Sequence, residues 1–426
     1  MTEITADKRD GPEHDHETDL LIVGAGPVGL ALALALRDSG LRILLADARS
    51  AATIAADPRV LALSHGTRTT LEALGVWEAL AADTTPITRI HVSQQGGFGR
   101  TLITAEEHAL DAVGYVTSAG RLAAVLRHAV EVAGIAIIDA TRVDTLPAAK
   151  PETDSGRTTL AANTVGDRIR VALTSASASP ARDKAPLPRR TSTCSARLVA
   201  RAEGGLSDRE PGVTHHDYGQ HALIAHVLAE GAPTGQAFER FTAEGPVALL
   251  PYHDGYALVH VGPPQRVAEW LEQSESSYLA ELQGIVGSRL RLRSVRDRIA
   301  YPLGLRYRNA ITATRTVWLG NAAQTLHPVA GQGFNLALRD VHALAHTLLR
   351  NVSDPGDAAL LATYVRARRL DRAGTIRFTD GLIRVFGNDF APLRHARGAG
   401  LLALDLIAPM RSFVARRMMF GARAWP

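Results

Sequence analysis

The sequence has a single cysteine, Cys194, among its 426 residues. One thiol can form neither an internal disulfide nor a pair of redox cysteines, so we expect the protein in a reducing compartment. No cluster of Cys and His residues has the spacing of a metal site either. We therefore predict that the protein binds no metal.

Long apolar runs and basic blocks are also lacking. No stretch of about 18 apolar residues is present, so we expect no transmembrane helix. Residues 1–18 are polar and have no apolar segment of the signal-peptide kind, which predicts a flexible tail and a cytoplasmic protein. The net charge is +4, and Arg supplies almost all of the basic excess. Because no Lys/Arg block alternates with aromatic residues, nucleic acid is not an expected partner.

What the sequence does contain is enough apolar material for two folded domains. Hydrophobic residues make up 46% of the chain and charged residues 21%. These are values of a globular protein, and the length exceeds that of one typical domain.

The clearest motif comes directly after a short apolar strand near the N-terminus. Residues 19–23, DLLIV, run into a G-x-G-x-x-G pattern and then into an Ala/Leu-rich helix expected to end at Ser39, before Gly40. A second strand, residues 42–46, ends at Asp47. This order of strand, glycines, helix, strand and acid is typical of a Rossmann dinucleotide site. The residues predicted to form it are Gly24, Gly26, Pro27, Val28, Gly29 and Asp47.

Each position of the motif has a physical reason. Gly24 permits the tight turn, Gly26 lets the backbone approach a pyrophosphate, and Gly29 lets the helix pack on the sheet. Pro27 suits the first helical turn, where its missing N–H would have no partner. Asp47 is placed to accept hydrogen bonds from an adenosine ribose, although a solvated strand end is the simpler alternative.

A second glycine-rich stretch, WLGNAAQTLHPVAGQGFNLALRD, covers residues 318–340. It lies between a strand expected over 316–319 and a helix expected over 335–344. The glycines leave backbone amides uncovered at a helix N-terminus, which suits a negative, flat group. Reduced flavin is such a group, so the pair of motifs favours FAD over NAD. The predicted contacts here are Asn321, Gly331, Gln332, Gly333 and Phe334.

Four segments together resemble the class A flavoprotein aromatic monooxygenases, the para-hydroxybenzoate hydroxylase-like superfamily. They are the first glycine motif, DPRVLALSHGTRTTLEALGVWEAL over 57–80, HVSQQGGFGRTLITAEEHALDAVGYV over 91–116, and the second glycine stretch. Within the superfamily the sequence is most similar to the ubiquinone-biosynthesis hydroxylases, in the branch that acts on 2-polyprenyl-6-methoxyphenol.

The resemblance assigns further residues to the flavin. Arg59 matches an arginine beside the flavin and its phosphates, and Arg121 lies close to the position of another family arginine. Pro328 matches a proline that lines the ring face, with His327 near the same place. Gln332 matches a position at the ring edge. Phe334 and Asn335 open the helix beside the pyrimidine edge. The group that deprotonates the substrate is not identified.

Two positions depart from the superfamily pattern. Glu203-Gly204-Gly205 stands where an Asp-Gly pair normally precedes a serine, which leaves the identity of the electron donor open. Asn321 replaces the usual aspartate of the second motif. Asparagine is neutral and can donate as well as accept hydrogen bonds.

The resemblance implies an FAD-dependent enzyme with non-covalent cofactor. It would hydroxylate a polyprenylated phenol through a flavin C4a-hydroperoxide, using O2 and NAD(P)H or another electron donor. Two alternatives stay open: a hydroxylase of a small soluble aromatic compound, and a non-catalytic flavin-binding subunit of a quinone-synthesis complex.

The expected fold is α/β (α+β overall): a Rossmann-like FAD-binding domain with a mixed-sheet substrate domain. The FAD-binding domain should be discontinuous, over 19–205 and 300–355. A loose insertion is expected over 150–193, with a hairpin core around residues 169–173. The substrate domain should cover 206–299 with part of 90–115, and helices should fill 356–426.

The C-terminal stretch APMRSFVARRMMFGARAWP, residues 408–426, alternates arginines with large apolar residues. The simpler interpretation is a last helix packed on the FAD-binding domain with its arginines in solvent. The functional alternative is a peripheral contact with the inner face of the membrane or with proteins of a quinone-biosynthesis complex.

Overall fold

The computed structural model describes residues 16–146, 164–175, 190–230, 235–386 and 391–421. Most of the predicted N-terminal tail, and much of the predicted insertion over 150–193, lie outside the described residues. The end of the predicted tail is already strand, because β1 begins at His16 rather than at Asp19.

A nine-stranded sheet forms one half of the molecule. Its parallel centre runs β8–β2–β1–β12–β19. These strands are Ala136–Ile138, Ile43–Ala46, His16–Val23, Arg190–Arg201 and Thr316–Trp318. Antiparallel strands complete it at its edges: β9 (Thr141–Thr145), β10 (Thr164–Val165), β11 (Arg168–Ser175) and β18 (Thr312–Ala313).

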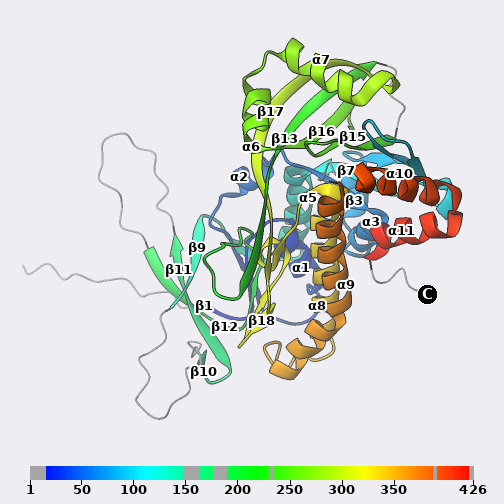
Figure 1. The fold of residues 1–426 in the computed structure, drawn as a ribbon. Helices are drawn as coiled ribbons and strands as arrows, with labels where there is room; N and C mark the ends of the chain where they lie inside the picture. Colours follow the sequence, from blue (N-terminus) through cyan, green and yellow to red (C-terminus); the bar gives the residue numbers. More distant parts are fainter. Residues whose placement is uncertain (1–15, 147–163, 176–189, 231–234, 387–390, 422–426) are drawn as a thin grey trace, which may run out of the picture.

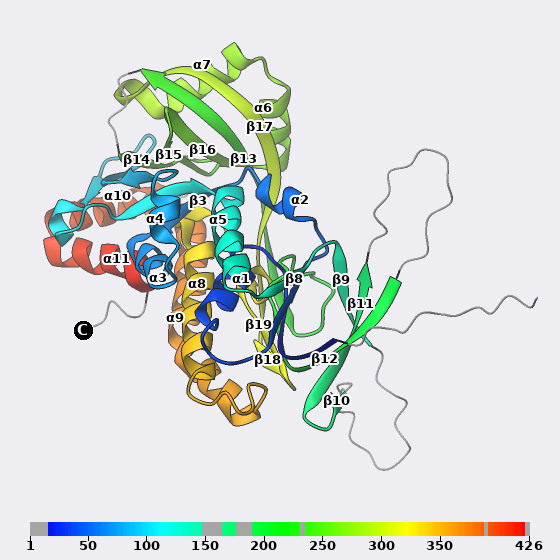
Figure 2. The same cartoon turned by 180° about the vertical axis from the view of Figure 1, so that it is seen from behind.

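Alternation along β1 explains how this sheet is buried on both faces. Leu20 and Ile22 pack in the large core beneath the helices, whereas Leu21 and Val23 pack with β11 and β12 on the other face. The helices over the first face are α1 (Pro27–Ala35), α5 (Ala119–Val132) and α8 (Gln332–Leu348). Both α5 and α8 contact α1, as Figure 2 shows from behind.

An eight-stranded mixed sheet forms the other half, in the order β20–β17–β13–β16–β15–β14–β5–β6. One face of it is covered by α6 (Pro264–Glu272) and α7 (Glu275–Val286), seen at the top of Figure 1. Trp270 and Tyr278 of these helices are fully buried against the sheet. The strands are Gln324–Thr325, Arg291–Arg308, Val213–Glu230, Gly255–Gly262, Pro246–Tyr252, Gln236–Phe241, Arg89–Gln94 and Arg100–Thr104.

A small sheet lies between the two halves. It consists of β3 (Val60–Ser64), β7 (Gly114–Ser118) and β4 (Thr85–Ile87), in that order. Three short helices accompany it: α2 (Ala51–Ala55), α3 (His65–Ala73) and α4 (Trp77–Ala81).

Three helices close the chain: α9 (Ala358–Phe386), α10 (Ala391–Leu406) and α11 (Ala408–Phe420). Buried ion pairs join α9 to α8, since Arg339 contacts Asp371 at 2.8 Å and Arg368 contacts Asp340 at 2.6 Å. None of the described helices is by itself long and apolar enough to cross a membrane. The bent pair formed by residues 395–406 and 408–420 meets the length and composition test only when its two arms are taken together, with a bend of 97°.

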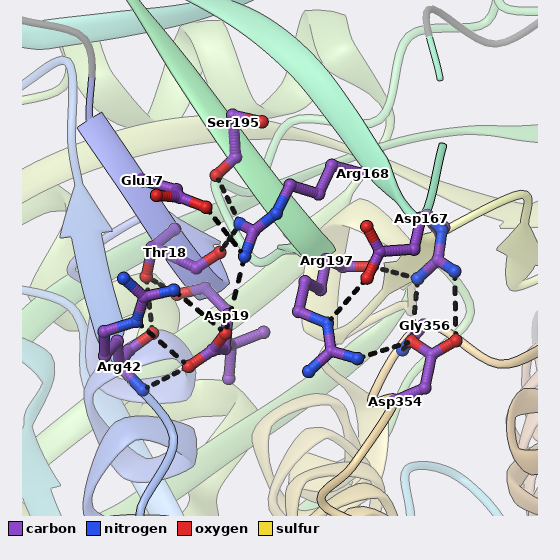
Figure 3. Close-up of polar contacts among 12 residues, drawn as sticks. Glu17, Thr18, Asp19, Arg42, Asp167, Arg168, Ser195, Arg197, Asp354 and Gly356 are labelled. Atoms are coloured by element: carbon purple, nitrogen blue, oxygen red, sulfur yellow. Dashed lines mark hydrogen bonds and ion pairs between the residues drawn. The ribbon is translucent and has the colours of Figure 1, made fainter. Parts of the chain in front are cut away.

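Arginines fasten the antiparallel strands to the amino-terminal end of the parallel sheet (Figure 3). Arg168 of β11 donates to the backbone oxygen of Thr18 at 3.0 Å and to that of Ser195 at 3.3 Å. Arg197 of β12 contacts Asp167 at 3.2 Å. The described part of the predicted insertion is therefore continuous with the large sheet: β11 pairs with β9, β10 and β12.

Three predicted helix boundaries were wrong. The first helix ends at Ala35 rather than Ser39, because hydrogen bonds of the i to i+3 kind tighten the chain after it. Gly40 takes a positive φ of 75° in the following turn. The helix of the second motif begins at Gln332, three residues before the predicted start at Asn335, and ends at Leu348.

Candidate dinucleotide site

The first glycine motif forms a turn in which side chains would not fit. Gly24 has a φ of 108°, and a Cβ at Gly29 would lie 1.9 Å from the Gly24 oxygen. Gly26 is the N-cap of α1, and no side chain caps that helix. The first amides of α1 therefore face outward without a side-chain partner, which is the arrangement that binds a phosphate.

Asp47 supports this turn from within the protein. It is 5% exposed. It accepts hydrogen bonds from the backbone amides of Ala25 and Arg49, both at 2.8 Å. The Arg49 guanidinium contacts the same carboxylate at 3.1 Å. The predicted role of Asp47 at a ribose stays a prediction, whereas its role in fixing the turn is visible in the structure.

Arg49 is a residue that the sequence reasoning missed. Its side chain is 42% exposed, and it is the group nearest to Gly26, since a Cβ there would lie 3.6 Å from its Nη2. It therefore places a positive charge at the edge of the predicted pyrophosphate position. The available signal was the Asp-x-Arg spacing directly after the second strand.

The second glycine motif lies near the first because the strands that precede the two motifs belong to the same sheet. Strand β19 pairs in parallel with β12, which pairs in parallel with β1. Gly320 takes a φ of 56°, and a Cβ there would lie 3.2 Å from Val28 of α1. Asn321 is exposed, and its Cβ lies 3.9 Å from the position that a Cβ at Gly204 would take. The two predicted motifs and the Glu203-Gly204-Gly205 turn thus come together.

The start of α8 is the second uncapped helix end. Its N-cap, Gly331, has a φ of 59° and gives no side-chain cap. Gly333 has open space around the position of a Cβ. Gln332 is 5% exposed and donates to the Met418 oxygen of α11 at 3.3 Å. Phe334 packs on the main core. No side chain caps the first amides of α8, so their predicted contact with a negative group stays a prediction.

The side chain of Asn335 is occupied by the protein itself. Its Nδ2 donates to the backbone oxygens of Ala62 at 3.0 Å and Gly331 at 2.8 Å. Its Oδ1 accepts from the Ser64 amide at 2.9 Å and the Thr67 hydroxyl at 2.8 Å. Asn335 therefore positions the start of α8 against β3 and α3.

His327 is buried, with 1% of its surface exposed. Its Nδ1 accepts a hydrogen bond from the Val329 amide at 3.2 Å, so the proton of the neutral ring is on Nε2. That Nε2–H has no partner among the described residues. Burial lowers the pKa of His327 to about 4. The neighbouring Pro328 is exposed and begins the short turn to Gly331.

Tyr218 of β13 is the residue of the mixed sheet that contacts His327. Its ring meets that of His327 edge-on, with centroids 5.9 Å apart. Its hydroxyl donates to Asp380 of α9 at 2.7 Å. Burial, together with Asp380, raises the pKa of Tyr218 well above its usual value. The hydroxyl therefore remains protonated at neutral pH.

The two predicted arginines are held by acidic partners. Arg59 contacts Asp57 through its Nε at 2.9 Å, and 52% of its side chain is exposed. Arg121 contacts Asp83 at 2.6 Å and the Ala79 oxygen at 3.3 Å. The guanidinium of Arg121 therefore binds the end of α4. Its predicted role at the cofactor stays a prediction.

Similarity to known proteins identifies the family of the chain. A family model described as an FAD binding domain matches residues 17–379. The chain is 34% identical over 424 residues to ubiquinone hydroxylase UbiL of Rhodospirillum rubrum, covering 97% of this chain and 92% of the relative. The chain belongs to the family of FAD-dependent ubiquinone hydroxylases.

Other members of the family are also similar over most of their length. The 3-demethoxyubiquinol 3-hydroxylase of Escherichia coli is 29% identical over 402 residues, covering 91% of this chain and 95% of that protein. The human mitochondrial ubiquinone biosynthesis monooxygenase COQ6 is 25% identical over 457 residues, covering 94% and 92%. The FAD-dependent monooxygenase class predicted from the sequence is confirmed.

Solved structures confirm the predicted fold class. The p-nitrophenol 4-monooxygenase PnpA of Pseudomonas putida superposes with a TM-score of 0.72 at 16% identity, covering 96% of this chain and 99% of that one. The flavin-dependent brominase Bmp2 gives a TM-score of 0.71 at 15% identity, with 96% of each chain covered. At these identities the likeness shows the α/β architecture alone.

FAD fits the arrangement of this ubiquinone-hydroxylase family member. The start of α1 and the Gly204 turn lie beside Gly320 and Asn321 of the second motif, and α8 likewise begins without a side-chain cap. Arg49 adds a cation, and the Nε2–H of His327 is a buried donor without a partner in the described chain. These donors match the negative pyrophosphate and the polar pyrimidine edge of the cofactor.

A mostly apolar cavity of about 70 Å³ opens beside the start of α8. Gln332 and Asn335 line one side of it. Ile90 and Ile103 of the mixed sheet, and Met418 of α11, line other sides. The sequence reasoning did not find this cavity, because its walls come from strands and helices far apart in the chain.

Glu239 of β14 is a second residue that the sequence reasoning missed. Its in-register neighbours are Ala248 and Val92. Phe241, two residues further along the same strand, stacks on Phe386 of α9, so this face of the sheet is turned toward the C-terminal helices. The carboxyl makes no hydrogen bond or ion pair with the described residues, and burial raises the pKa of Glu239 to about 7.

Proposed function

We propose that the protein hydroxylates a polyprenylated phenol in ubiquinone biosynthesis, using O2 and electrons from NAD(P)H. The observation that carries this proposal is the similarity to the R. rubrum ubiquinone hydroxylase over 97% of the chain. The mostly apolar lining of the cavity beside the start of α8 agrees with it, because an apolar wall suits the ring of a prenylated phenol.

The residues of the chain have separate tasks in this reaction. The turn over Gly24–Gly29 and the cation of Arg49 hold the pyrophosphate. The first amides of α8 stabilise negative charge at the pyrimidine edge of the flavin ring. Asn335 keeps those amides in place from behind. When bound, FAD supplies the activation of O2 for transfer of one oxygen atom to an aromatic ring.

The surroundings of the ring site must be dry and must hold the phenol in line. Ile90, Ile103 and Met418 exclude water on the side of the cavity. His327 remains neutral at physiological pH because its pKa is lowered, so its Nε2–H acts as an uncharged donor. These residues position the phenol and exclude water from the ring site, and the cofactor carries out the redox chemistry.

NAD(P)H is the electron donor typical of the family. The chain has no second G-x-G-x-x-G fingerprint after a strand, so we infer that the donor binds only transiently. We also infer a cytoplasmic location with peripheral contact to the inner face of the membrane and to other quinone-pathway proteins. The reason is that the proposed substrate carries a prenyl chain that partitions into the bilayer.

The test is deletion of the gene, followed by identification of the quinone intermediate that accumulates. We expect a polyprenylated phenol that lacks one hydroxyl group, and restoration of the quinone by the wild-type chain but not by a Gly26→Val variant that cannot bind FAD. Accumulation of a small aromatic acid would replace the proposal with the soluble-substrate alternative. Full restoration by the variant without FAD would indicate a non-catalytic subunit.

A further inference from the structure

Exposed apolar side chains gather where α10 turns into α11. Residues 406–410 are five consecutive exposed positions, LIAPM, none of them charged. Leu406 is 73% exposed and Ile407 48%. Together with four exposed neighbours they form what we call the elbow surface: Phe98, Leu102, Leu402, Leu406, Ile407 and Met410. Single exposed apolar residues are ordinary on a protein surface, whereas a group of neighbours like this one indicates an interaction site.

The two parts of the elbow surface form one platform. Phe98 and Leu102 lie on the β5–β6 hairpin, and α10 packs on β6. A Cβ at Gly398 of α10 would lie 2.5 Å from the Phe98 oxygen, so helix and hairpin touch through their backbones. The Leu102 amide donates to Asp405 at 3.4 Å. In both views the elbow lies at the edge of the molecule, opposite β9–β11 (Figures 1 and 2).

The polar groups at the bend have protein partners. Arg411 donates to the backbone oxygens of Leu404, at 3.0 Å, and of Asp405, which end α10. The same guanidinium contacts the Glu107 carboxylate at 2.7 Å and 3.0 Å. The carbonyls of the broken helix are thus satisfied, and the charge of Arg411 is compensated. These contacts lower the cost of placing the bend at a bilayer interface, because the carbonyls of Leu404 and Asp405 already accept hydrogen bonds.

The charge of this region favours one kind of surface. Among the described side chains of the two helices, Arg416 is exposed and Arg417 partly exposed, whereas Arg397 is buried and Arg411 is paired with Glu107. Arg100 and Arg416 are exposed near the elbow surface. Basic residues around an apolar tip complement anionic lipid headgroups over an acyl interior.

We propose that the elbow surface docks on an anionic lipid bilayer, with its apolar side chains in the interface and the neighbouring Arg100 and Arg416 at the headgroups. The 97° bend presents a tip, whereas a protein partner would more commonly take a straight helical face in a groove. Ala415 and Met419 of α11 are buried against the protein, so the helix pair rests on the membrane and does not cross it.

This inference stands without the proposed function, but it has a consequence for it. Met418 and Met419 of α11 line the apolar cavity beside the start of α8. Docking through the elbow therefore brings the wall of that cavity near the bilayer in which a prenylated phenol resides.

The test compares sedimentation of the full-length, FAD-loaded protein with vesicles of phosphatidylcholine alone and of phosphatidylcholine and phosphatidylglycerol in equal parts. The variant is the double substitution Leu406→Gln and Ile407→Gln. The control is Leu370→Gln on α9, since Leu370 is 74% exposed, like Leu406, but lies outside the elbow surface. FAD content and turnover of a short-chain, water-soluble phenol are measured in parallel.

We expect wild type and control to bind the anionic vesicles, less strongly in high salt, and the double variant to bind about tenfold or more weakly with unchanged FAD content. Equal binding by the double variant would overturn the proposal, as would an equal loss in the control. A wild-type dimer that the double variant dissociates, without vesicle binding, would assign the elbow to a second copy of the chain. Turnover of the soluble phenol tests the proposed function alone. The proposal for the elbow surface is decided by vesicle binding, whatever the turnover.

Discussion

The side-chain oxygen of Asn335 accepts a hydrogen bond from the backbone amide of Ser64, 271 residues earlier in the chain, at 2.9 Å. With the bonds to Ala62, Gly331 and Thr67, this one side chain joins β3 and α3 to the first turn of α8. The orientation of the first amides of α8, which we propose face the flavin, therefore depends on a residue whose own side chain is already occupied.

Asn335→Ala should destabilise the protein and weaken FAD binding together. The substitution leaves buried partners without bonds, which costs about 1–3 kcal/mol for each unsatisfied group. We expect a lower free energy of unfolding in urea and a weaker FAD titration of the apoprotein. Asn321→Ala, at an exposed asparagine of the same motif, is the control for stability. An unfolding curve of Asn335→Ala that matched the wild type would show that these bonds contribute little.

Arg49→Gln should weaken FAD binding while the fold remains intact. A charge-assisted hydrogen bond of this kind is worth about 1.5–3 kcal/mol, which is a ten- to hundredfold change in affinity. The matched control is Arg42→Gln, because Arg42 lies at the other end of β2 and pairs with Asp19 of β1. Fluorescence titration of the apoprotein with FAD measures the effect. Equal affinities for both variants would place Arg49 outside the cofactor site.

His327→Gln should make the free energy of unfolding depend less on pH between 6.5 and 4. Burial lowers the pKa of His327 from 6.5 in the unfolded chain to about 4. Between these values the unfolded chain binds a proton that the folded protein excludes, so the free energy of unfolding falls as the pH drops from 6.5 to 4. Glutamine has no proton to bind, so the variant lacks this part of the fall. The measurement is urea unfolding at several pH values, and a parallel fall in both proteins would contradict the prediction.

Glu239→Gln should remove a loss of stability that occurs as the pH rises, the opposite of the effect at His327. Burial raises the pKa of Glu239 from 4.5 to about 7. The wild type therefore loses stability as the pH rises from 4.5 to 7, because the folded protein must hold a proton or bury a charge. The variant should gain about 1–3 kcal/mol over the wild type above pH 7 and little at pH 4. A constant difference across this range would show that the carboxyl is well hydrated.

The dinucleotide turn could be predicted from the sequence because glycine positions encode backbone geometry directly. Only glycine tolerates the φ of Gly24 and the close approach at Gly29, so the pattern specifies the turn almost alone. Helix boundaries were less accurate, since the end of α1 is set by local hydrogen bonds that no residue type announces.

The side-chain environment could not be predicted in the same way. The burial of His327, its tautomer and its unpaired Nε2 depend on β13 and on the turn after Pro328, which only the folded chain brings together. Glu239 was missed because its strand was not recognised. The C-terminal arginines were expected in solvent or at a membrane, but Arg411 contacts Glu107 and the end of α10, so the exposed apolar surface begins earlier.

The placement of β19 beside β12 has a consequence for the newly made chain. The first glycine turn leaves the ribosome early, but the strand and the helix start that complete the cofactor site are encoded about three quarters of the way along. A nascent polypeptide that stops before α8 contains only the first of the two helix starts that we assign to FAD, so we expect it to bind the cofactor weakly. On this assignment, tight FAD binding requires that nearly the whole chain has been synthesised and that β19 has paired with β12.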